Sequence, residues 1–97
     1  MRYIIIYDIS DDNIRSLVAK KLEDYGLTRI QFSSFIGKLP RFKLSSLCYE
    51  LNEVINNAKD SERRSIIIYP LCDSCYSKGI AIDPNMKESK DDDIIVI

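Results

Sequence analysis

Residues 2–7 read RYIIIY, and this stretch decides the fold class of the chain. It is a short run of β-branched and aromatic side chains, too apolar to alternate, which is typical of a central strand covered on at least one face. Residues 65–71, SIIIYPL, have the same texture, with Pro70 limiting how far that strand can pair. We therefore expect two central strands of one sheet, the first of which stops at Asp8.

A helix is predicted directly after the first strand. Ser10, Asp11 and Asp12 offer N-cap chemistry, and Gly26 can adopt the left-handed conformation that ends a helix. Between them, apolar side chains recur along a single helical stripe, which consists of Ile14, Leu17, Val18, Leu22 and Tyr25.

Two further strands and a second helix follow. Residues 28–39 are rich in strand formers, but their alternation slips at Ser33 and Ser34, which indicates a tight turn or bulge between two short strands. Pro40 suits the start of a helix, and residues 59–64 read as a solvated loop. The apolar stripe of this helix is Leu44, Leu47, Cys48, Leu51, Val54, Ile55 and Ala58.

The resulting order is βαββαβ, which predicts an α+β, ferredoxin-like domain over residues 1–83. Such a domain has an antiparallel four-stranded sheet with both helices on one face, so the other face is uncovered. Depending on register, that face would carry Tyr3, Ile5, Tyr7, Ile67 or Tyr69, and an exposed apolar patch of this kind normally marks an interface. We therefore expect a homodimer through the open sheet faces.

The remaining residues lie outside the basic unit. Residues 79–83 could form a fifth strand. Residues 84–97 read as an acidic tail that ends in an apolar segment, Ile94–Ile97, which requires an edge to dock against.

Length, charge and cysteine content bound the class of protein. Ninety-seven residues suffice for one domain, and no apolar run approaches the roughly 20 residues needed to span a bilayer. The net charge of −1 divides into +2 for residues 1–87 and −3 for residues 88–97, so any nucleic-acid contact must be local or supplied by assembly. Three cysteines cannot all pair within one chain, which favours a reducing cytoplasm.

The Cys72-x-x-Cys75 pair invites a zinc or a redox interpretation. A structural zinc site requires four ligands, but the chain has no histidine and only one further cysteine, Cys48. The element order is also wrong for a thioredoxin-like fold. We interpret Cys72 and Cys75 as incidental thiols and Cys48 as a core residue.

Asp8, at the carboxyl end of the first strand, is the strongest candidate for chemistry. A carboxylate held there can ligate a hard cation, although Mg²⁺ is usually held by one or two carboxylates with waters and substrate phosphate. A two-fold axis would bring two copies of Asp8 together. The alternative is that Asp8 only terminates the strand and caps the helix.

Basic and aromatic residues interleave near this position. Arg15 and Arg29, with Phe32 and Phe35, could supply phosphate contacts and a stacking ring for nucleic acid. For the two phenylalanines, a place in the core is the simpler interpretation. The absence of histidine from the chain excludes histidine-dependent catalysis.

Taken together, residues across positions 2–71 resemble the CRISPR-associated protein 2 family in order and spacing. The residues that carry the resemblance are Tyr7-Asp8-Ile9, Arg15, Leu22, Tyr25-Gly26, Arg29-Ile30-Gln31, Ser33, Phe35 and Ile68-Tyr69-Pro70-Leu71. The resemblance implies a homodimer that works with the CRISPR integrase in spacer acquisition, with a strand near residues 79–83 that can pair with the partner's sheet. It also implies a metal-dependent endonuclease that acts on single-stranded RNA or double-stranded DNA.

The same resemblance implies roles for individual residues. Asp8 would be the Mg²⁺ ligand, one from each subunit, flanked by Tyr7 as a second catalytic position. Supporting or substrate-contacting positions would be Arg15, Arg29, Ser33 and Phe35. The chain departs from the family pattern at Leu17, where some relatives carry a basic residue, and at Ser34, where a larger apolar side chain is expected.

Two functions from different classes follow. One is the Mg²⁺-dependent endonuclease with paired Asp8 carboxylates. The other is a non-catalytic adaptor that bridges copies of the integrase and lies along DNA, for which Ile94–Ile97 would be a docking segment. A small RNA-cleaving toxin or a ligand-binding regulatory module is a more distant alternative.

Overall fold

The computed structural model describes residues 1–57, 63–84 and 95–96. The first part of the chain forms β1 (Arg2–Ile9), α1 (Asp12–Asp24), β2 (Thr28–Gln31) and β3 (Ser34–Lys38). The second part forms α2 (Arg41–Asn56), β4 (Arg64–Leu71), α3 (Asp73–Ser77), β5 (Ile80–Ala81) and β6 (Ile95–Val96).

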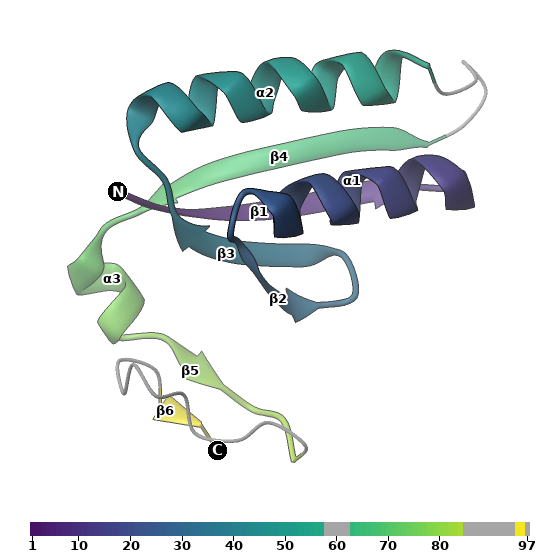
Figure 1. Ribbon diagram of the computed structural model, residues 1–97. Helices are drawn as coiled ribbons and strands as arrows, with labels where there is room; N and C mark the ends of the chain where they lie inside the picture. The colour runs from purple at the N-terminus through teal and green to yellow at the C-terminus, as the bar shows by residue number, and fades with distance from the viewer. Residues whose placement is uncertain (58–62, 85–94, 97) are drawn as a thin grey trace.

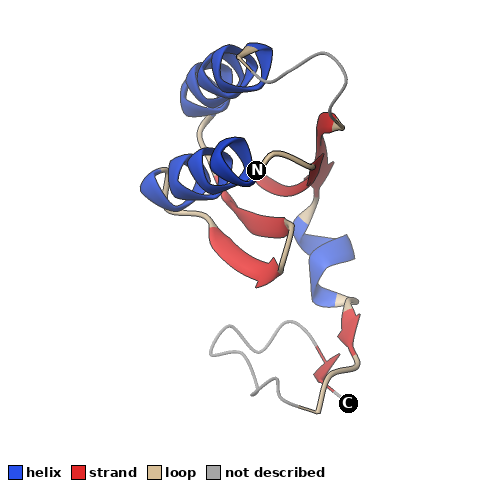
Figure 2. Cartoon of the chain, turned by 90° about the vertical axis from the view of Figure 1, so that its right-hand side faces the viewer, coloured by secondary structure: helices blue, strands red, loops and turns tan. Residues whose placement is uncertain are grey.

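The main sheet has four strands in the order β2-β3-β1-β4, and every neighbouring pair is antiparallel. Figures 1 and 2 show α1 and α2 together on one side of this sheet. This is the predicted ferredoxin-like α+β fold. β1 is central, as expected, but β4 is an edge strand, which explains why Pro70 fits within it: an edge position does not require its missing N–H.

The ends of the two long helices follow the local sequence closely. Asp11 is the N-cap of α1, and its carboxylate accepts a hydrogen bond of 2.9 Å from the backbone N–H of Ile14. Gly26, with φ of +84°, follows the C-cap as predicted. Pro40 precedes α2, and the last predicted residue of its apolar stripe, Ala58, lies outside the described residues.

The core lies between the sheet and the two helices. Its fully buried centre is formed by Phe35, Ile5, Leu22, Leu47 and Val18. Two residues assigned to helical stripes are not part of it, because Leu17 and Cys48 are both exposed. Each lies at the margin of its stripe, where helical spacing alone does not decide whether the helix turns a side chain toward the sheet.

Register decides which side chains the open sheet face carries. Ile5, Tyr7 and Ile9 are buried beneath the helices, so alternation puts Ile4, Ile6 and Asp8 on the open face. The expectation that Tyr3, Ile5 or Tyr7 would lie there was wrong, whereas Ile67 and Tyr69 do, as cross-strand partners of Ile6 and Ile4. The uncovered apolar face itself is present.

The segment after β4 differs from the sequence expectation in two ways. A short helix, α3, follows Cys72 directly and was not predicted. The expected strand over residues 79–83 forms only at Ile80–Ala81, and it pairs in parallel with β6 rather than with the main sheet. Figure 1 shows α3 as the link between the sheet and this two-stranded unit. Of the predicted acidic tail and docking segment, residues 85–94 and Ile97 lie outside the described residues.

Candidate functional site

Asp8 lies within β1 on the open sheet face, opposite Ser65 of β4. Its side chain is 63% exposed, and Oδ1 accepts a hydrogen bond of 3.1 Å from Nε of Arg63 in an exposed ion pair. The strand continues to Ile9, and the helix is capped by Asp11. Asp8 therefore neither ends the strand nor caps the helix. The alternative that Asp8 only terminates the strand and caps the helix is wrong.

Arg63 is held beside Asp8 by the residue that leads into α1. The backbone N–H of Arg63 donates to Oγ of Ser10 at 3.0 Å, and the backbone N–H of Ser10 donates to the carbonyl oxygen of Arg63 at 3.0 Å. This pair of hydrogen bonds joins the loop before β4 to the end of β1. A cation is thereby positioned next to the Asp8 carboxylate.

An exposed apolar patch lies next to Asp8 on the same face. Ile6, Ile67 and Tyr69 are exposed, and Ile6 lies directly opposite Ile67. We refer to these three residues as the open-face patch. Because side chains on one strand face repeat every second residue, Asp8 is the next side chain after Ile6 along β1.

Tyr7 lies on the opposite face of the sheet and is almost completely buried. Its hydroxyl donates to the carbonyl oxygen of Phe32 at 3.3 Å, and its backbone N–H donates to the carbonyl oxygen of Ser33 at 3.0 Å. Burial raises the pKa of the Tyr7 phenol above its ordinary value, against the lowering influence of the Arg29 and Arg15 cations. The phenol is therefore protonated at neutral pH and acts as a hydrogen-bond donor.

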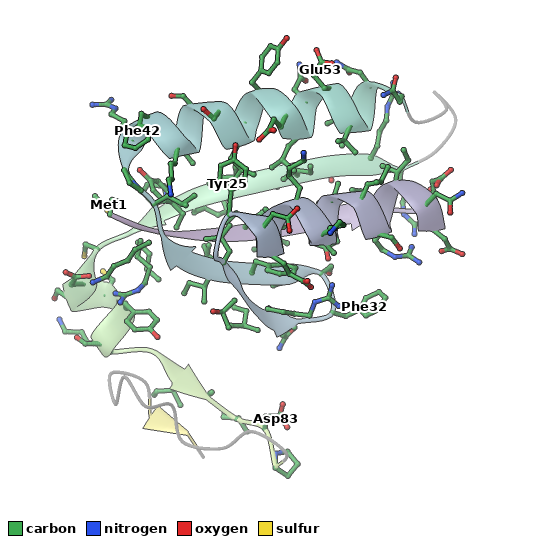
Figure 3. The ribbon with its side chains drawn as sticks, in the orientation of Figure 1. Met1, Tyr25, Phe32, Phe42, Glu53 and Asp83 are labelled. Atoms are coloured by element: carbon green, nitrogen blue, oxygen red, sulfur yellow. The ribbon has the colours of Figure 1, made fainter. Side chains whose placement is uncertain are left out.

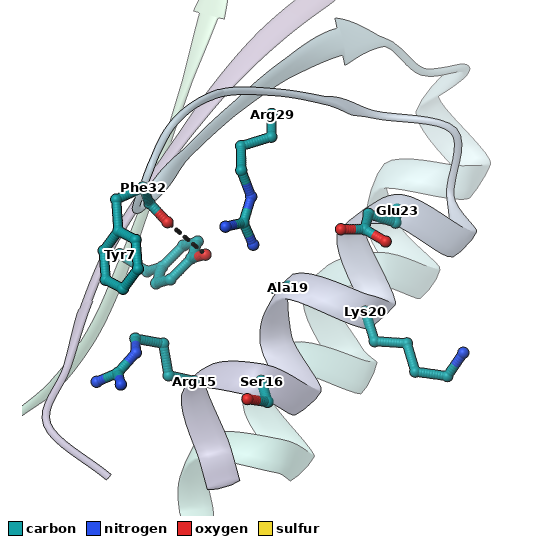
Figure 4. Close-up of a pocket in the computed structure, with 8 residues that line it drawn as sticks. All are labelled: Tyr7, Arg15, Ser16, Ala19, Lys20, Glu23, Arg29 and Phe32. Carbon is teal, nitrogen blue, oxygen red and sulfur yellow. Dashed lines mark hydrogen bonds between the residues drawn. The ribbon is translucent and has the colours of Figure 1, made fainter. Parts of the chain in front are cut away.

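Arg15 and Arg29 approach the same region from α1 and β2 (Figure 4). Nη1 of Arg15 donates to the carbonyl oxygen of Ile9 at 3.0 Å, and the same guanidinium is paired with Asp12. Its Cζ lies 5.6 Å from the centre of the Phe32 ring. Cζ of Arg29 lies 5.1 Å from the centre of the Phe35 ring. Both cations are thus oriented by aromatic rings.

Arg15, Arg29 and Phe32 line a groove of about 510 Å³ on the helical side of the sheet. Three cations and one acid border it, namely Arg15, Lys20, Arg29 and Glu23 (Figure 4). Phe32, which is 71% exposed, projects from the turn between β2 and β3 at the same place (Figure 3). A core position was the simpler expectation for Phe32, but a side chain in a two-residue turn has no layer to cover it.

The structure separates the residues predicted for the site into two groups. Asp8 is on the open face, whereas Tyr7, Arg15 and Arg29 border the groove on the helical face. The Ser33 carbonyl oxygen accepts the hydrogen bond from the backbone N–H of Tyr7 near the end of β1. Phe35 is fully buried, and its ring centre lies 6.3 Å from the ring centre of Tyr7.

Two neighbouring cations were missed by sequence reasoning. Lys20 was identifiable in principle, since it lies on the same helix as Arg15. Arg63 comes from a loop far along the chain, and only the tertiary structure brings it to Asp8. Within residues 1–57, 63–84 and 95–96, no three side chains of the His, Cys, Asp or Glu type cluster as a metal site.

A comparison with protein families matches residues 1–79 to the family described as CRISPR associated protein Cas2. The chain belongs to the Cas2 family. Cas2 membership agrees with the predicted resemblance, and it extends across the sheet, both long helices and α3.

Among relatives, the chain is similar to a CRISPR-associated endoribonuclease Cas2 of Archaeoglobus fulgidus, with 38% identity over 84% of this chain and 83% of the relative. It is also similar to a Cas1/Cas2 fusion endonuclease of Thermoproteus tenax, with 38% identity over 87% of this chain and 30% of that longer protein. A crystal structure of a hypothetical protein from Thermus thermophilus matches with a TM-score of 0.62 and 31% identity, covering 73% of this chain and 80% of the other. In the described part of this Cas2 chain, no helix has the length and hydrophobicity to cross a membrane.

Proposed function

We propose that this Cas2-family chain acts in CRISPR adaptation as a homodimer with the CRISPR integrase. We further propose that the dimer is a Mg²⁺-dependent endonuclease that cleaves single-stranded RNA or double-stranded DNA through two Asp8 carboxylates. Relatives such as that of Archaeoglobus fulgidus are named endoribonucleases, which supports hydrolysis of nucleic acid. The Thermoproteus tenax relative is a fusion of Cas1 and Cas2, which supports the integrase as a partner. The cytoplasmic location stays a prediction.

The observation that carries this proposal is the position of Asp8 beside the open-face patch. The patch exposes Ile6, Ile67 and Tyr69 to solvent in a single chain, and contact with a second copy would bury this apolar surface. A two-fold contact places the same residues of both chains against each other. Because Asp8 follows Ile6 on this face, such a contact would bring the two carboxylates toward one seam.

The donor chemistry of Asp8 fits a magnesium ion. An exposed carboxylate is a hard oxygen ligand, and Mg²⁺ requires only one or two of these when waters and phosphate oxygens complete its coordination. One Asp8 from each subunit would hold the ion, which would supply Lewis-acid activation of a water and of the phosphodiester. Arg63 pairs with Asp8 and is itself able to contact a phosphate once the ion pair opens.

The groove on the helical face suits a strand of nucleic acid. Arg15, Arg29 and Lys20 can bind phosphates, while the exposed Phe32 ring offers a surface on which a base can stack. Tyr7, held by the Phe32 carbonyl, fixes the turn that carries this ring. In this proposal Tyr7 orients the groove, and it is not the base that takes up a proton.

The direct test of the proposal is a cleavage assay on the purified full chain. Labelled single-stranded RNA and duplex DNA are incubated with Mg²⁺ or with EDTA, and the products are resolved on denaturing gels. We expect cleavage that requires the metal. The absence of cleavage from both substrates would remove the endonuclease and leave only the adaptor.

If the subunits associate through the open-face patch, we expect Ile67→Lys to separate them. Two copies of a lysine at a self-complementary seam would be desolvated next to each other, at a cost of several kcal/mol, so the dimer should dissociate at least ~100-fold more readily. Sedimentation velocity over a range of concentrations measures this change. Leu17→Lys is the matched control, because Leu17 is a similarly exposed apolar residue on α1, outside the patch. Equal association of both variants would show that the patch is not the interface.

If a base stacks on the Phe32 ring at the groove, we expect Phe32→Ala to weaken binding of single-stranded RNA. Loss of one base–aromatic stack costs ~1–3 kcal/mol, which corresponds to about 5- to 150-fold in Kd. Fluorescence anisotropy with a labelled oligonucleotide measures the change, and Phe32→Tyr should restore most of the affinity. Phe42→Ala is the control, since Phe42 on α2 is 70% exposed, as against 71% for Phe32. If both alanine variants bind equally well, the ring does not contact RNA.

The adaptor is the second candidate function, and the pairing of β5 with β6 favours it. β6 lies within the predicted docking segment and pairs with β5 rather than with the main sheet. The two strands together therefore form a small unit, separate from the main sheet, that an integrase subunit could recognise.

A chain that ends at Asp93 lacks β6 and should lose integrase binding in a pull-down or by calorimetry. Because β6 is not a strand of the main sheet, thermal unfolding of the truncated chain should remain close to that of the full chain. Retained integrase affinity would count against docking through this segment.

A further inference from the structure

Cys72 and Cys75 lie together at the start of α3. Cys72 is the N-cap residue, and its Sγ accepts a hydrogen bond of 3.4 Å from the backbone N–H of Cys75. Both cysteines are exposed. The pair is therefore joined by this backbone hydrogen bond and open to small molecules in solution.

The surroundings make the two thiols unequal. The pKa of Cys72 is lowered, first by the hydrogen bond from the Cys75 backbone N–H and then by that from the Cys75 thiol, while the charge of Asp73 opposes this effect. The pKa of Cys75 is raised, because its thiol donates to Cys72 and faces the Cys72 charge. Cys72, whose Sγ accepts the Cys75 backbone N–H, is thus placed as the attacking thiolate and Cys75 as the thiol that follows it.

A zinc site is a poorer fit to this pair. The described residues bring no further cysteine, histidine or carboxylate into a metal-binding group with the two thiols. Asp73, the nearest acid in sequence, is instead paired with Arg2 of β1 at 2.9 Å.

The helix that carries the pair is fixed to the main sheet. Besides the contact with Asp73, the Arg2 guanidinium lies 3.8 Å from the centre of the Tyr76 ring, and Tyr76 is buried. Residues three apart at a helix start have Cβ atoms about 5–6 Å apart, whereas a disulfide needs about 3.5–4.5 Å. Joining the sulfurs therefore requires the first turn of α3 to tighten.

We propose that Cys72 and Cys75 form a reversible dithiol–disulfide site that exchanges with low-molecular-weight disulfides such as oxidised glutathione. The Cys72 thiolate attacks one sulfur of the glutathione disulfide, forming a mixed disulfide and releasing one glutathione thiolate. The Cys75 thiol then gives up its proton and attacks the Cys72 sulfur, releasing the second glutathione. The protein loses two hydrogens and is oxidised, and the glutathione disulfide is reduced to two thiols. In this proposal the two cysteines act as a reactive pair, whereas the sequence alone indicated incidental thiols.

The test uses the reduced full chain incubated with oxidised glutathione, quenched in acid, alkylated and analysed by peptide mass spectrometry. We expect an intrachain Cys72–Cys75 disulfide, reversed by reduced glutathione. Cys48 should remain alkylated throughout, and it serves as the internal control because it is an exposed thiol on α2.

Two single variants separate the roles of the sulfurs. Cys75→Ser should accumulate the glutathione adduct on Cys72, because the second attack is lost. Cys72→Ser should form no intrachain disulfide and should gain no more adduct than Cys48 does. Circular dichroism establishes that each variant is folded. Equal modification of Cys48 and Cys72 in the unsubstituted chain, or an adduct on Cys75 in preference to Cys72, would overturn the proposal.

Discussion

Asp8→Asn is expected to reduce Mg²⁺-dependent cleavage by at least ~100-fold while leaving the protein folded. The amide keeps the shape of the side chain but removes the charge that holds the cation, and metal activation contributes several kcal/mol at about 1.4 kcal/mol per factor of ten. The fold should tolerate the change, because Asp8 is 63% exposed and its ion pair with Arg63 contributes at most ~1 kcal/mol. Initial rates on labelled RNA and duplex DNA, with melting curves for both proteins, measure the two effects.

Asp24→Asn is the matched control for this experiment. Asp24, near the end of α1, is 59% exposed and lies 3.9 Å from Lys20 in an ion pair comparable to that of Asp8. This variant should cleave at the rate of the unsubstituted chain. Cleavage by Asp8→Asn at that same rate would place the hydrolytic centre elsewhere and would leave Asp8 without a role in catalysis.

Phe35→Ala is expected to destabilise the protein by ~3–5 kcal/mol, because it empties the centre of the core. Phe35 is fully buried between β1, β2 and the helices, in contact with the Tyr7 ring and the Arg29 cation. A loss of this size is a large fraction of the ~5–15 kcal/mol that stabilises a domain, and it corresponds to a fall of at least ~12 °C in melting temperature. Denaturant and thermal unfolding measure it directly.

Phe35→Leu distinguishes a core residue from a substrate contact. Leucine keeps most of the apolar volume but lacks the ring, so we expect a smaller loss of stability and nearly unchanged RNA affinity for the folded protein. If instead Phe35→Ala melts like the unsubstituted chain and loses only RNA binding, the ring contacts the ligand and the core must open to expose it.

Much of the architecture could be read from the spacing of apolar residues. The strand predicted at residues 2–7, the helix after Asp11 and its end at Gly26 all follow from local chemistry: β-branched runs, a capping carboxylate and a residue free to adopt positive φ. The ferredoxin-like order then follows from the succession of elements. These features depend on neighbours within a few positions along the chain.

The errors occurred where a side chain's environment depends on distant elements. Leu17 and Cys48 fit helical stripes but face solvent, since the stripe that is buried depends on how each helix lies on the sheet. Phe32 reads as a core aromatic, yet the turn leaves it uncovered. The first strand is too apolar to alternate, so its sequence did not show which set of residues faces the helices, and a shift of one residue exchanges the two faces.

The linear order of residues by itself determined the class of fold, the family resemblance and the choice of Asp8 as the residue to examine. Only the tertiary structure decided that Asp8 and Tyr7 lie on opposite faces, that Arg63 lies beside Asp8, and that Cys72 accepts a hydrogen bond from the Cys75 backbone. The reason is physical: local spacing sets which elements form, whereas sheet register and helix docking, which join residues more than 50 positions apart, set what each side chain meets.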